Sequence, residues 1–221
     1  MCGRFSFALD LDDLLAVFPE FSPPTQLQPR YNIAPTQPVP VVANDGQAQI
    51  TFFHWGLVPS WAKEISIGEH MINARAETLA QKPSFRAAYR KRRCLILADG
   101  FYEWQKEPGR QGKTPMYVRM ASGEPFAFAG LWEAWSGQEP PLYSCTIITT
   151  TPNELLAPIH DRMPVILPRS AYKLWLDPED RLPSALQALL APYPAAEMTA
   201  FPVSPRVNSP ANDGPECILP A

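Results

Sequence analysis

The chain has 221 residues, of which 46% are hydrophobic and 19% charged, and its formal net charge at pH 7 is -3. These values exclude a disordered chain and indicate a globular protein large enough to bury its own core. The negative charge argues against non-specific duplex binding through overall basic charge, although it is compatible with a local basic groove. The 27 prolines favour loops and short strands over long helices.

No basic segment followed by an apolar stretch opens the chain, so we expect no signal peptide. The longest apolar runs are too short to span a membrane. The four cysteines lie far apart and show no spacing typical of a disulfide framework or a zinc site. We therefore expect a cytosolic protein without a metal.

The first half of the chain predicts one helix and one strand between proline-rich loops. Apolar residues recur at helical spacing over residues 10–18, behind Asp10 as N-cap. Residues 19–40 hold seven prolines and predict ordered loop or a short edge strand. Residues 48–58 predict a strand, and Ser84 is expected to cap a short helix that carries Phe85, Ala88 and Tyr89.

The second half is rich in predicted strands. Residues 94–98 are a continuous apolar run typical of a buried strand, and Asp99-Gly100 ends it as a turn. Further strands are predicted at 101–106, 116–120, 125–132 and 143–150, and short helices at 170–177 and 184–191. No repeat or break in composition divides the chain. The prediction is one α+β domain over residues 2–221, built on an antiparallel, partly barrel-like sheet with short flanking helices.

Cys2 is the most informative residue. Its side chain is small, so we expect Met1 to be removed and Cys2 to become the mature N-terminus. Its α-amine, with a reference pKa of about 7.7–8.0, and its thiol, at about 8.5, would then sit on adjacent carbons. The amine can form a Schiff base with an aldehyde, and the thiol can close on the imine carbon as a thiazolidine. The alternative is a small residue near a frayed end.

Two residues suit proton transfer. His160 lies between two prolines, and a histidine near its ordinary pKa of about 6.5 is a natural proton shuttle. Glu103 lies between aromatic residues after a predicted turn, where desolvation would raise its pKa. Strand alternation places Phe101 and Glu103 on one face. The alternatives are a hydrogen-bonded structural histidine and an exposed strand glutamate.

Two segments have residues suited to binding nucleic acid. In an extended backbone Asn73 and Arg75 share a face, where an amide and a guanidinium suit a phosphate and its sugar; the alternative is a surface salt bridge between Arg75 and Glu77. The basic run at residues 86–93 is either a solvated helix face or a nucleic-acid contact. Bases could stack on a few exposed aromatic residues, most of which we expect in the core. The aromatic candidates are Trp55, Trp61, Tyr102, Trp104, Trp132 and Trp135.

Six motifs stand in a distinctive order. They are Met1-Cys2-Gly3-Arg4-Phe5, Tyr31-Asn32-Ile33-Ala34-Pro35, Trp55-Gly56-Leu57, Asn73-Ala74-Arg75-Ala76-Glu77, Ala98-Asp99-Gly100-Phe101-Tyr102-Glu103-Trp104 and Ile159-His160-Asp161-Arg162-Met163-Pro164. Together they resemble the SRAP-domain family of SOS-response-associated, abasic-site processing proteins, from residue 2 to about residue 210. One departure is a single tryptophan, Trp61, where the family often has a pair.

The resemblance implies a protein that binds single-stranded DNA and crosslinks an abasic site through the mature Cys2. The single-domain organisation favours a monomer, and we expect no cofactor. In the cytoplasm it would associate with the nucleoid when bound to DNA. Asn73, Glu103 and His160 would line the pocket of Cys2 as catalytic residues. The residues implied to hold or shape the DNA are Arg4, Asn32, Pro35, Trp61, Arg75, Thr149 and Arg162.

Two other function classes stay open. In an N-terminal-nucleophile cysteine peptidase or amidohydrolase, the free amine would act as base for the Cys2 thiol, and Met1 would be removed by autoprocessing. The family resemblance itself implies such self-removal, so a peptidase label can coexist with crosslinking. A non-enzymatic single-strand binder would keep full function in Cys2→Ala.

Overall fold

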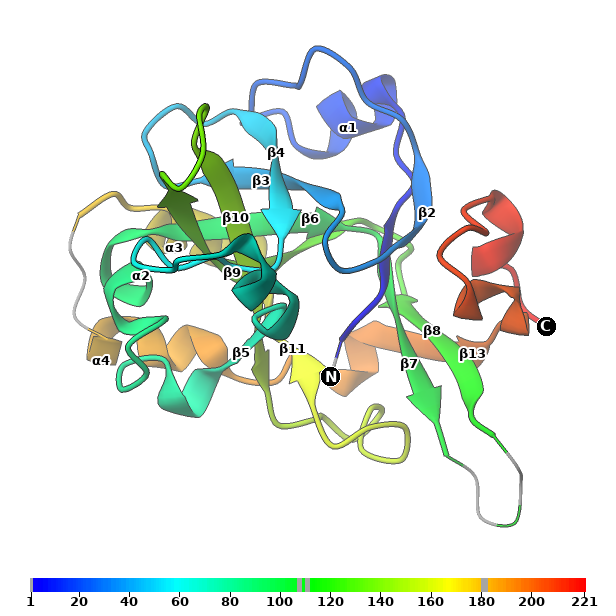
Figure 1. The fold of residues 1–221 in the computed structure, drawn as a ribbon. Coiled ribbons are helices and arrows are strands. Elements are labelled where there is room, and N and C mark those ends of the chain that lie inside the picture. The colour runs from blue at the N-terminus through cyan, green and yellow to red at the C-terminus, as the bar shows by residue number, and fades with distance from the viewer. Residues whose placement is uncertain (1, 107–108, 110–111, 180–182) are drawn as a thin grey trace.

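The N-terminal strand lies inside a five-stranded antiparallel sheet. The computed structural model describes residues 2–106, 109, 112–179 and 183–221, so Met1 lies outside the described residues. The strand order is β13-β8-β7-β1-β2, so β1 has a partner on each side (Figure 1). The five strands are β1 (Phe5–Phe7), β2 (Arg30–Ile33), β7 (Gly100–Gln105), β8 (Thr114–Met120) and β13 (Met198–Pro202).

The second sheet closes into a ring, because one strand, β10, pairs with both β4 and β9. Around the ring the strands are β10 (Leu142–Thr150), β4 (Ile50–Trp55), β3 (Pro38–Ala43), β6 (Arg93–Ala98) and β9 (Phe126–Trp135). The strands outside the ring are β5 (Asn73–Arg75), β11 (Met163–Pro164) and β12 (Ile166–Leu167). β10 runs parallel to β4 and β5, and the other pairings described in this sheet are antiparallel. The predicted α+β class with a partly barrel-like sheet is confirmed.

Short helices flank the sheets. They are α1 (Leu11–Val17), α2 (Arg86–Lys91), α3 (Arg169–Trp175) and α4 (Pro183–Leu186). Single 3-10 segments lie at Ile65–His70, Ala76–Thr78, Gln187–Leu190, Ala195–Glu197, Pro205–Asn208 and Pro215–Ile218. Within the described residues, none of the helices has the length and apolar character needed to cross a membrane.

The predicted helices at 10–18 and 170–177 are confirmed as α1 and α3, and a short helix is also present at α2, but two details of the helix predictions are wrong. Asp10 caps α1, since its carboxylate accepts a hydrogen bond from the Asp13 N–H at 2.9 Å. Ser84 does not cap α2: the N-cap is Phe85, and no side chain bonds the helix N-terminus. The Phe85 side chain is buried, so packing rather than capping fixes the start of this helix. The predicted helix 184–191 divides into α4 and a 3-10 turn.

Aromatic packing fixes β1 against the barrel. Phe5 is fully buried, and its ring centroid lies 5.1 Å from that of Trp55 and 5.7 Å from that of Phe128. Phe101, the partner of Phe5 on β7, also contacts Phe128 at 6.0 Å. These edge-to-face contacts belong to one buried cluster that includes residues of both sheets. The N-terminal strand is therefore held by the core as well as by its two neighbours.

A buried polar network holds β1 in register. The Ser6 hydroxyl bonds the Asp99 carboxylate and lies 2.8 Å from the Tyr117 hydroxyl. The other carboxylate oxygen of Asp99 accepts the Ala8 N–H at 2.7 Å. Gly100 makes room for this network, because a Cβ there would lie 2.2 Å from the Tyr117 ring.

We predict that Gly100→Ala lowers the free energy of unfolding by about 1–3 kcal/mol, since the buried Tyr117 ring cannot move away from the added methyl. Urea unfolding measures the change. Gly214→Ala is the matched control, because its Cβ would meet the side chain of the exposed Glu216, which can rotate aside. Equal stabilities of the two variants would contradict the predicted clash.

Candidate active site

Cys2 lies at the junction between the two sheets. Its side chain is fully buried, and its carbonyl oxygen accepts a hydrogen bond from Asn73 Nδ2 on β5 at 2.8 Å. Its thiol points back toward the Arg4 carbonyl oxygen at 3.8 Å, and that oxygen also accepts the Tyr102 N–H of β7 at 2.9 Å. Burial, followed by the nearby charge of Glu103, raises the pKa of the Cys2 thiol well above its ordinary value. The thiol is therefore protonated at neutral pH and requires a base to react.

A carboxylate and an imidazole lie together beside Cys2. Glu103 comes from β7 and His160 from the loop before β11, and His160 Nε2 lies 3.9 Å from Glu103 Oε2. Burial raises the pKa of Glu103 to about 7, although the positive charge of Lys113 lowers it. Burial also lowers the pKa of His160. Glu103 can therefore exchange a proton near neutral pH, and burial favours the neutral form of the His160 imidazole.

The imidazole of His160 is oriented by its own loop. Its Nδ1 accepts the Arg162 N–H at 3.0 Å, so the neutral ring carries its proton on Nε2, which faces Glu103. Asp161 Oδ1, 2.8 Å from Nδ1, favours the protonated ring instead. Gln105 Nε2 donates to the Pro158 carbonyl at 3.1 Å and ties this loop to the end of β7.

Two of the candidate site residues each carry a buried oxygen that has no hydrogen-bond partner among the residues that the structure describes. The two oxygens are Asn73 Oδ1 and Thr149 Oγ1, on the parallel neighbours β5 and β10. A buried oxygen without a partner is costly in a folded protein and marks a position where a ligand can bond. Thr149 pairs with Arg75 in the β5–β10 register, and Asn73 lies two residues before Arg75 on β5. Asn73, Arg75 and Thr149 therefore come from the same pair of neighbouring strands.

Arg4 and Asn32 are bound within the protein. Arg4 Nη1 donates to Asn32 Oδ1 and to the Val207 carbonyl, both at 2.7 Å, and the guanidinium stacks on the Trp104 ring at 5.7 Å. Asn32 is fully buried, and its amide nitrogen bonds backbone carbonyls of the C-terminal segment. The structure therefore brings Arg4 close to Cys2, while Asn32 fixes the C-terminal segment from inside.

The other residues implied to contact DNA differ in exposure. Arg75 is exposed and Asn73 half-buried on the same extended strand, as the sequence predicted, and 59% of Trp61 is exposed. Pro35 is half-buried. Arg162 bonds both Glu77 oxygens, at 2.7 and 3.0 Å, and the Thr149 carbonyl at 2.7 Å. Arg162 thus holds the end of β10 through the Thr149 carbonyl. It also forms an ion pair with Glu77, the residue that the sequence offered as an alternative partner of Arg75.

The basic run at residues 86–93 is partly internal. Arg93 is fully buried and donates to backbone carbonyls, including that of Trp175 at 2.9 Å, and Arg92 bonds Glu133 at 2.7 Å. Of the aromatic candidates for base stacking, Trp55 and Tyr102 are fully buried and Trp135 nearly so. These residues stabilise the fold, which leaves Trp61, Trp104 and Trp132 as the candidates with accessible surface. Trp132 is packed against Phe53 and Tyr143.

A cleft of about 550 Å³ opens beside the carboxylate and the imidazole. Its lining residues are Glu103, Trp104, Lys113, His160 and Asn208. Sequence reasoning did not identify Lys113 or Asn208. Asn208 follows Glu103 by more than a hundred positions and belongs to no motif, so only the fold brings it here.

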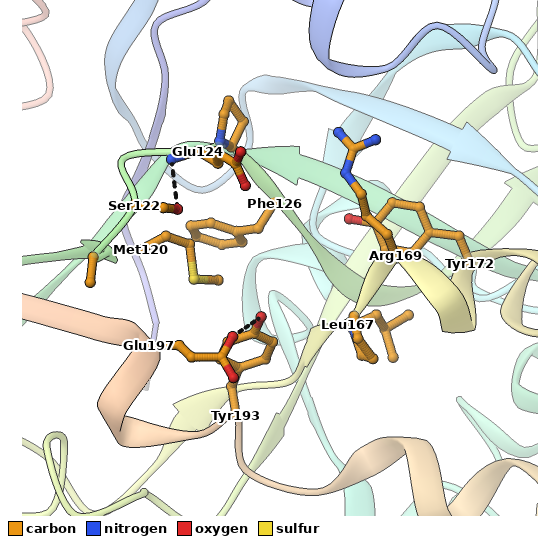
Figure 2. A pocket seen from close by; sticks show the side chains of 12 residues that line it. Met120, Ser122, Glu124, Phe126, Leu167, Arg169, Tyr172, Tyr193 and Glu197 are labelled. Atoms are coloured by element: carbon orange, nitrogen blue, oxygen red, sulfur yellow. Dashed lines mark hydrogen bonds between the residues drawn. The ribbon is translucent and has the colours of Figure 1, made fainter.

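Another pocket, of about 440 Å³, lies between the β8–β9 turn and α3 (Figure 2). Its polar side chains bond one another or the surrounding protein: Tyr193 pairs with Glu197 at 3.1 Å, and Arg169 stacks on Phe18 at 4.9 Å. None of the motif residues around Cys2 lines this pocket. The titratable groups suited to chemistry are therefore those around Cys2.

We predict a pH-dependent cost of burying Glu103. Folding raises its pKa from 4.5 to about 7, so the folded state binds the proton more tightly. The free energy of unfolding then falls as the pH rises through this window, by up to about 3 kcal/mol. Urea unfolding between pH 4.5 and 8 should show this fall relative to Glu103→Gln. Glu154→Gln, at an exposed carboxylate, should behave like the wild type. Parallel curves for the wild type and Glu103→Gln would contradict the raised pKa.

Comparisons with known proteins identify the family of this chain. The family model described as SOS response associated peptidase (SRAP) matches residues 1–210. The chain is 50% identical to the abasic site processing protein YoqW of Bacillus subtilis over 222 residues, covering 99% of each chain. It is 34% identical to the abasic site processing protein HMCES of Rattus norvegicus, covering 100% of this chain and 76% of that one. A crystal structure of a protein from Bacteroides thetaiotaomicron matches with a TM-score of 0.87, 26% identity and full coverage of both chains. The chain therefore belongs to the SOS response associated peptidase (SRAP) family.

Proposed function

We propose that this protein processes abasic sites in single-stranded DNA by forming a covalent thiazolidine between Cys2 and the C1′ aldehyde of the opened deoxyribose. The observation that carries the proposal is the burial of Cys2 against Asn73, beside a Glu103–His160 pair in which burial raises the pKa of Glu103 to about 7. Relatives that cover the whole of this chain are named abasic site processing proteins, which supports the choice of substrate.

The reaction requires a free amine on Cys2, so Met1 must be removed first. The neutral amine attacks C1′ of the aldehyde and forms a carbinolamine. Glu103 in its protonated form donates a proton to the departing hydroxyl, and water leaves as the protonated imine forms, which keeps the nitrogen-bound hydrogen. The thiol then attacks the same carbon, and its proton returns to Glu103. Amine, thiol and aldehyde thus yield a thiazolidine and one water, with no oxidant or metal required.

The surrounding residues divide the remaining tasks. Asn73 holds the Cys2 carbonyl through its amide nitrogen, and its buried Oδ1 is available to orient the freed amine. His160, with Nε2 toward Glu103, would exchange protons at the sugar oxygen and assist reversal of the adduct. Because ring closure consumes the imine, it competes with β-elimination and would protect the DNA strand from cleavage.

The DNA backbone would pass over the end of the barrel near β5. Arg75 is exposed there and can bind a phosphate bidentately. Trp61 offers an exposed ring to a base, and Pro35 would help shape the strand. Arg4, Asn32 and Arg162 would contribute by holding the segments around the site in place, and Arg4 would add its positive charge. A few arginines in one groove can bind a short strand even on a protein of negative net charge.

A second function is compatible with the first. The family description contains the word peptidase, and removal of Met1 by the Cys2 site itself would be one peptide-bond cleavage. A broader amidohydrolase would turn over small amides with Cys2 intact. Intact mass of the purified protein before and after incubation, with Cys2→Ala for comparison, separates self-removal of Met1 from removal by another enzyme.

We predict an SDS-stable adduct when the protein is mixed with a single-stranded oligonucleotide that carries one abasic site. Cys2→Ala should abolish it, because both the thiol and the thiazolidine ring are lost. Denaturing electrophoresis detects the adduct, and its mass should equal that of protein plus DNA minus one water. Absence of a wild-type adduct would overturn the proposed function. Cys217→Ala, at another buried cysteine, is the matched control and should crosslink normally.

We predict that Glu103→Gln and His160→Ala slow adduct formation or reversal by about 10²–10⁴-fold while DNA affinity stays close to that of the wild type, because general acid–base catalysis contributes a factor of this size. Single-turnover rates and fluorescence anisotropy measure the two properties separately. Wild-type rates in either variant would remove that residue from the mechanism.

A further inference from the structure

The cleft beside Glu103 and His160 has a second wall, made by the β7–β8 hairpin and the C-terminal segment. Lys113 lies where β8 begins, Trp104 lies near the end of β7, and Asn208 comes from the 3-10 segment Pro205–Asn208. None of these three residues belongs to the DNA contacts that the family resemblance implies. In Figure 1 the strands β7 and β8 and the strand β5 lie on opposite sides of the N-terminal end of the chain, where Cys2 bonds Asn73 of β5.

Lys113 supplies a positive charge at the mouth of this cleft. It is exposed, and it forms no direct ion pair with another of the residues that the structure describes. Its charge lowers the pKa of both Glu103 and His160, so its ammonium lies close enough to act on both groups across the cleft. An exposed cation that no described carboxylate pairs with directly, beside a reacting aldehyde, is suited to an anion that the substrate itself carries.

Asn208 supplies a neutral donor whose orientation is fixed. The Trp104 indole can only donate, and its Nε1 lies 2.7 Å from Asn208 Oδ1. The amide nitrogen of Asn208 therefore carries two N–H donors with no partner among the described residues, on a side chain that lines the cleft. The Trp104 ring also stacks against the Arg4 guanidinium, and this contact helps to hold the indole in place.

The segment that carries Asn208 is firmly anchored. Asp213 accepts the backbone N–H groups of Tyr31 and Asn32 at 2.6 and 2.7 Å and pairs with Arg30. Asn32 in turn bonds the carbonyls of residues 207, 209 and 212. Asn208 therefore presents its amide from a fixed position, as a preorganised binding group must.

We propose that Lys113 and Asn208 form a phosphate subsite for the nucleotide next to the abasic site, on the side of the lesion opposite to Arg75. The proposal rests on the proposed function and adds a second anchor, so that the abasic sugar is held between two phosphates. The ligand class is a phosphodiester monoanion, bound by one ammonium and one amide. The subsite positions C1′ at Cys2 and takes no part in the proton transfers.

Binding is best tested in a Cys2→Ala background, which separates affinity from crosslinking. For Lys113→Gln we expect affinity for an abasic single strand to fall about three- to ten-fold and the salt slope to fall by about 0.7, as for the loss of one phosphate contact. Asn208→Asp keeps the acceptor for Trp104 and replaces the donor with a carboxylate, so we expect a larger loss. Lys173→Gln, an identical charge change on the exposed face of α3, should leave affinity and slope unchanged.

A methylphosphonate scan identifies the phosphate. Each of the two phosphates that flank the abasic site is replaced by an uncharged methylphosphonate, and affinity is measured with Lys113 and with Lys113→Gln. At the contacted position the substitution should lower the DNA affinity of the protein that has Lys113 and should not lower that of Lys113→Gln any further. This non-additivity is the sign that the phosphate and Lys113 interact. At the other position both proteins should lose affinity equally.

The outcomes separate this inference from the function on which it rests. If the protein with Cys2 forms no adduct with abasic DNA or with free 2-deoxyribose, the proposed function fails. If the adduct forms, but Lys113→Gln binds like Lys173→Gln and neither methylphosphonate couples to Lys113, the phosphate subsite is overturned. Coupling at one position, with a reduced salt slope, supports it.

Discussion

The structure depends on the position of one short strand. β1 lies between β7 and β2, its phenylalanines are buried in the core, and Ser6 is bonded to Asp99. An N-terminal segment usually frays, because few contacts oppose its conformational entropy. Here pairing on both sides and core packing hold the segment, so Cys2 occupies one defined place. A chemistry that needs the amine of the chain end is possible only when that end is ordered.

Burial gives the site its reactivity and costs stability. Glu103 leaves water for a position beside Cys2, which raises its pKa to about 7 and makes it a proton donor and acceptor near neutral pH. The same burial keeps the Cys2 thiol protonated until a base removes its proton. His160 is oriented by the Arg162 backbone and by the loop that Gln105 holds. The three groups come from three separate elements, and the register of β1 with β7 brings the first two together.

Several charged residues in the motifs bond other parts of the protein and hold together the segments that surround the site. Arg162 is bonded to Glu77 and Thr149, and Arg4 to Asn32 and Val207. Their guanidinium groups join segments that are distant in the chain, and this leaves exposed cations such as Arg75 and Lys113 to meet a ligand. The negative net charge is therefore no obstacle to binding a short anionic strand, because the charges that matter are those at the groove.

The sequence by itself determined the fold class and the main strands, and it singled out Cys2 as the candidate nucleophile. Alternation and apolar runs are local, so the helix at Leu11–Val17 and the buried strand at Arg93–Ala98 could be predicted from their neighbours. The chemistry proposed for Cys2 likewise rests on its position next to Met1 in the sequence. Only the tertiary structure decided which side chains surround it. Pairing of β5 with β10 sets Arg75 opposite Thr149, Asn208 comes from a distant part of the chain, and Asn32 is buried in the interior. These are contacts between segments far apart in sequence, and no local pattern records them, because they arise from the packing of one sheet against the other.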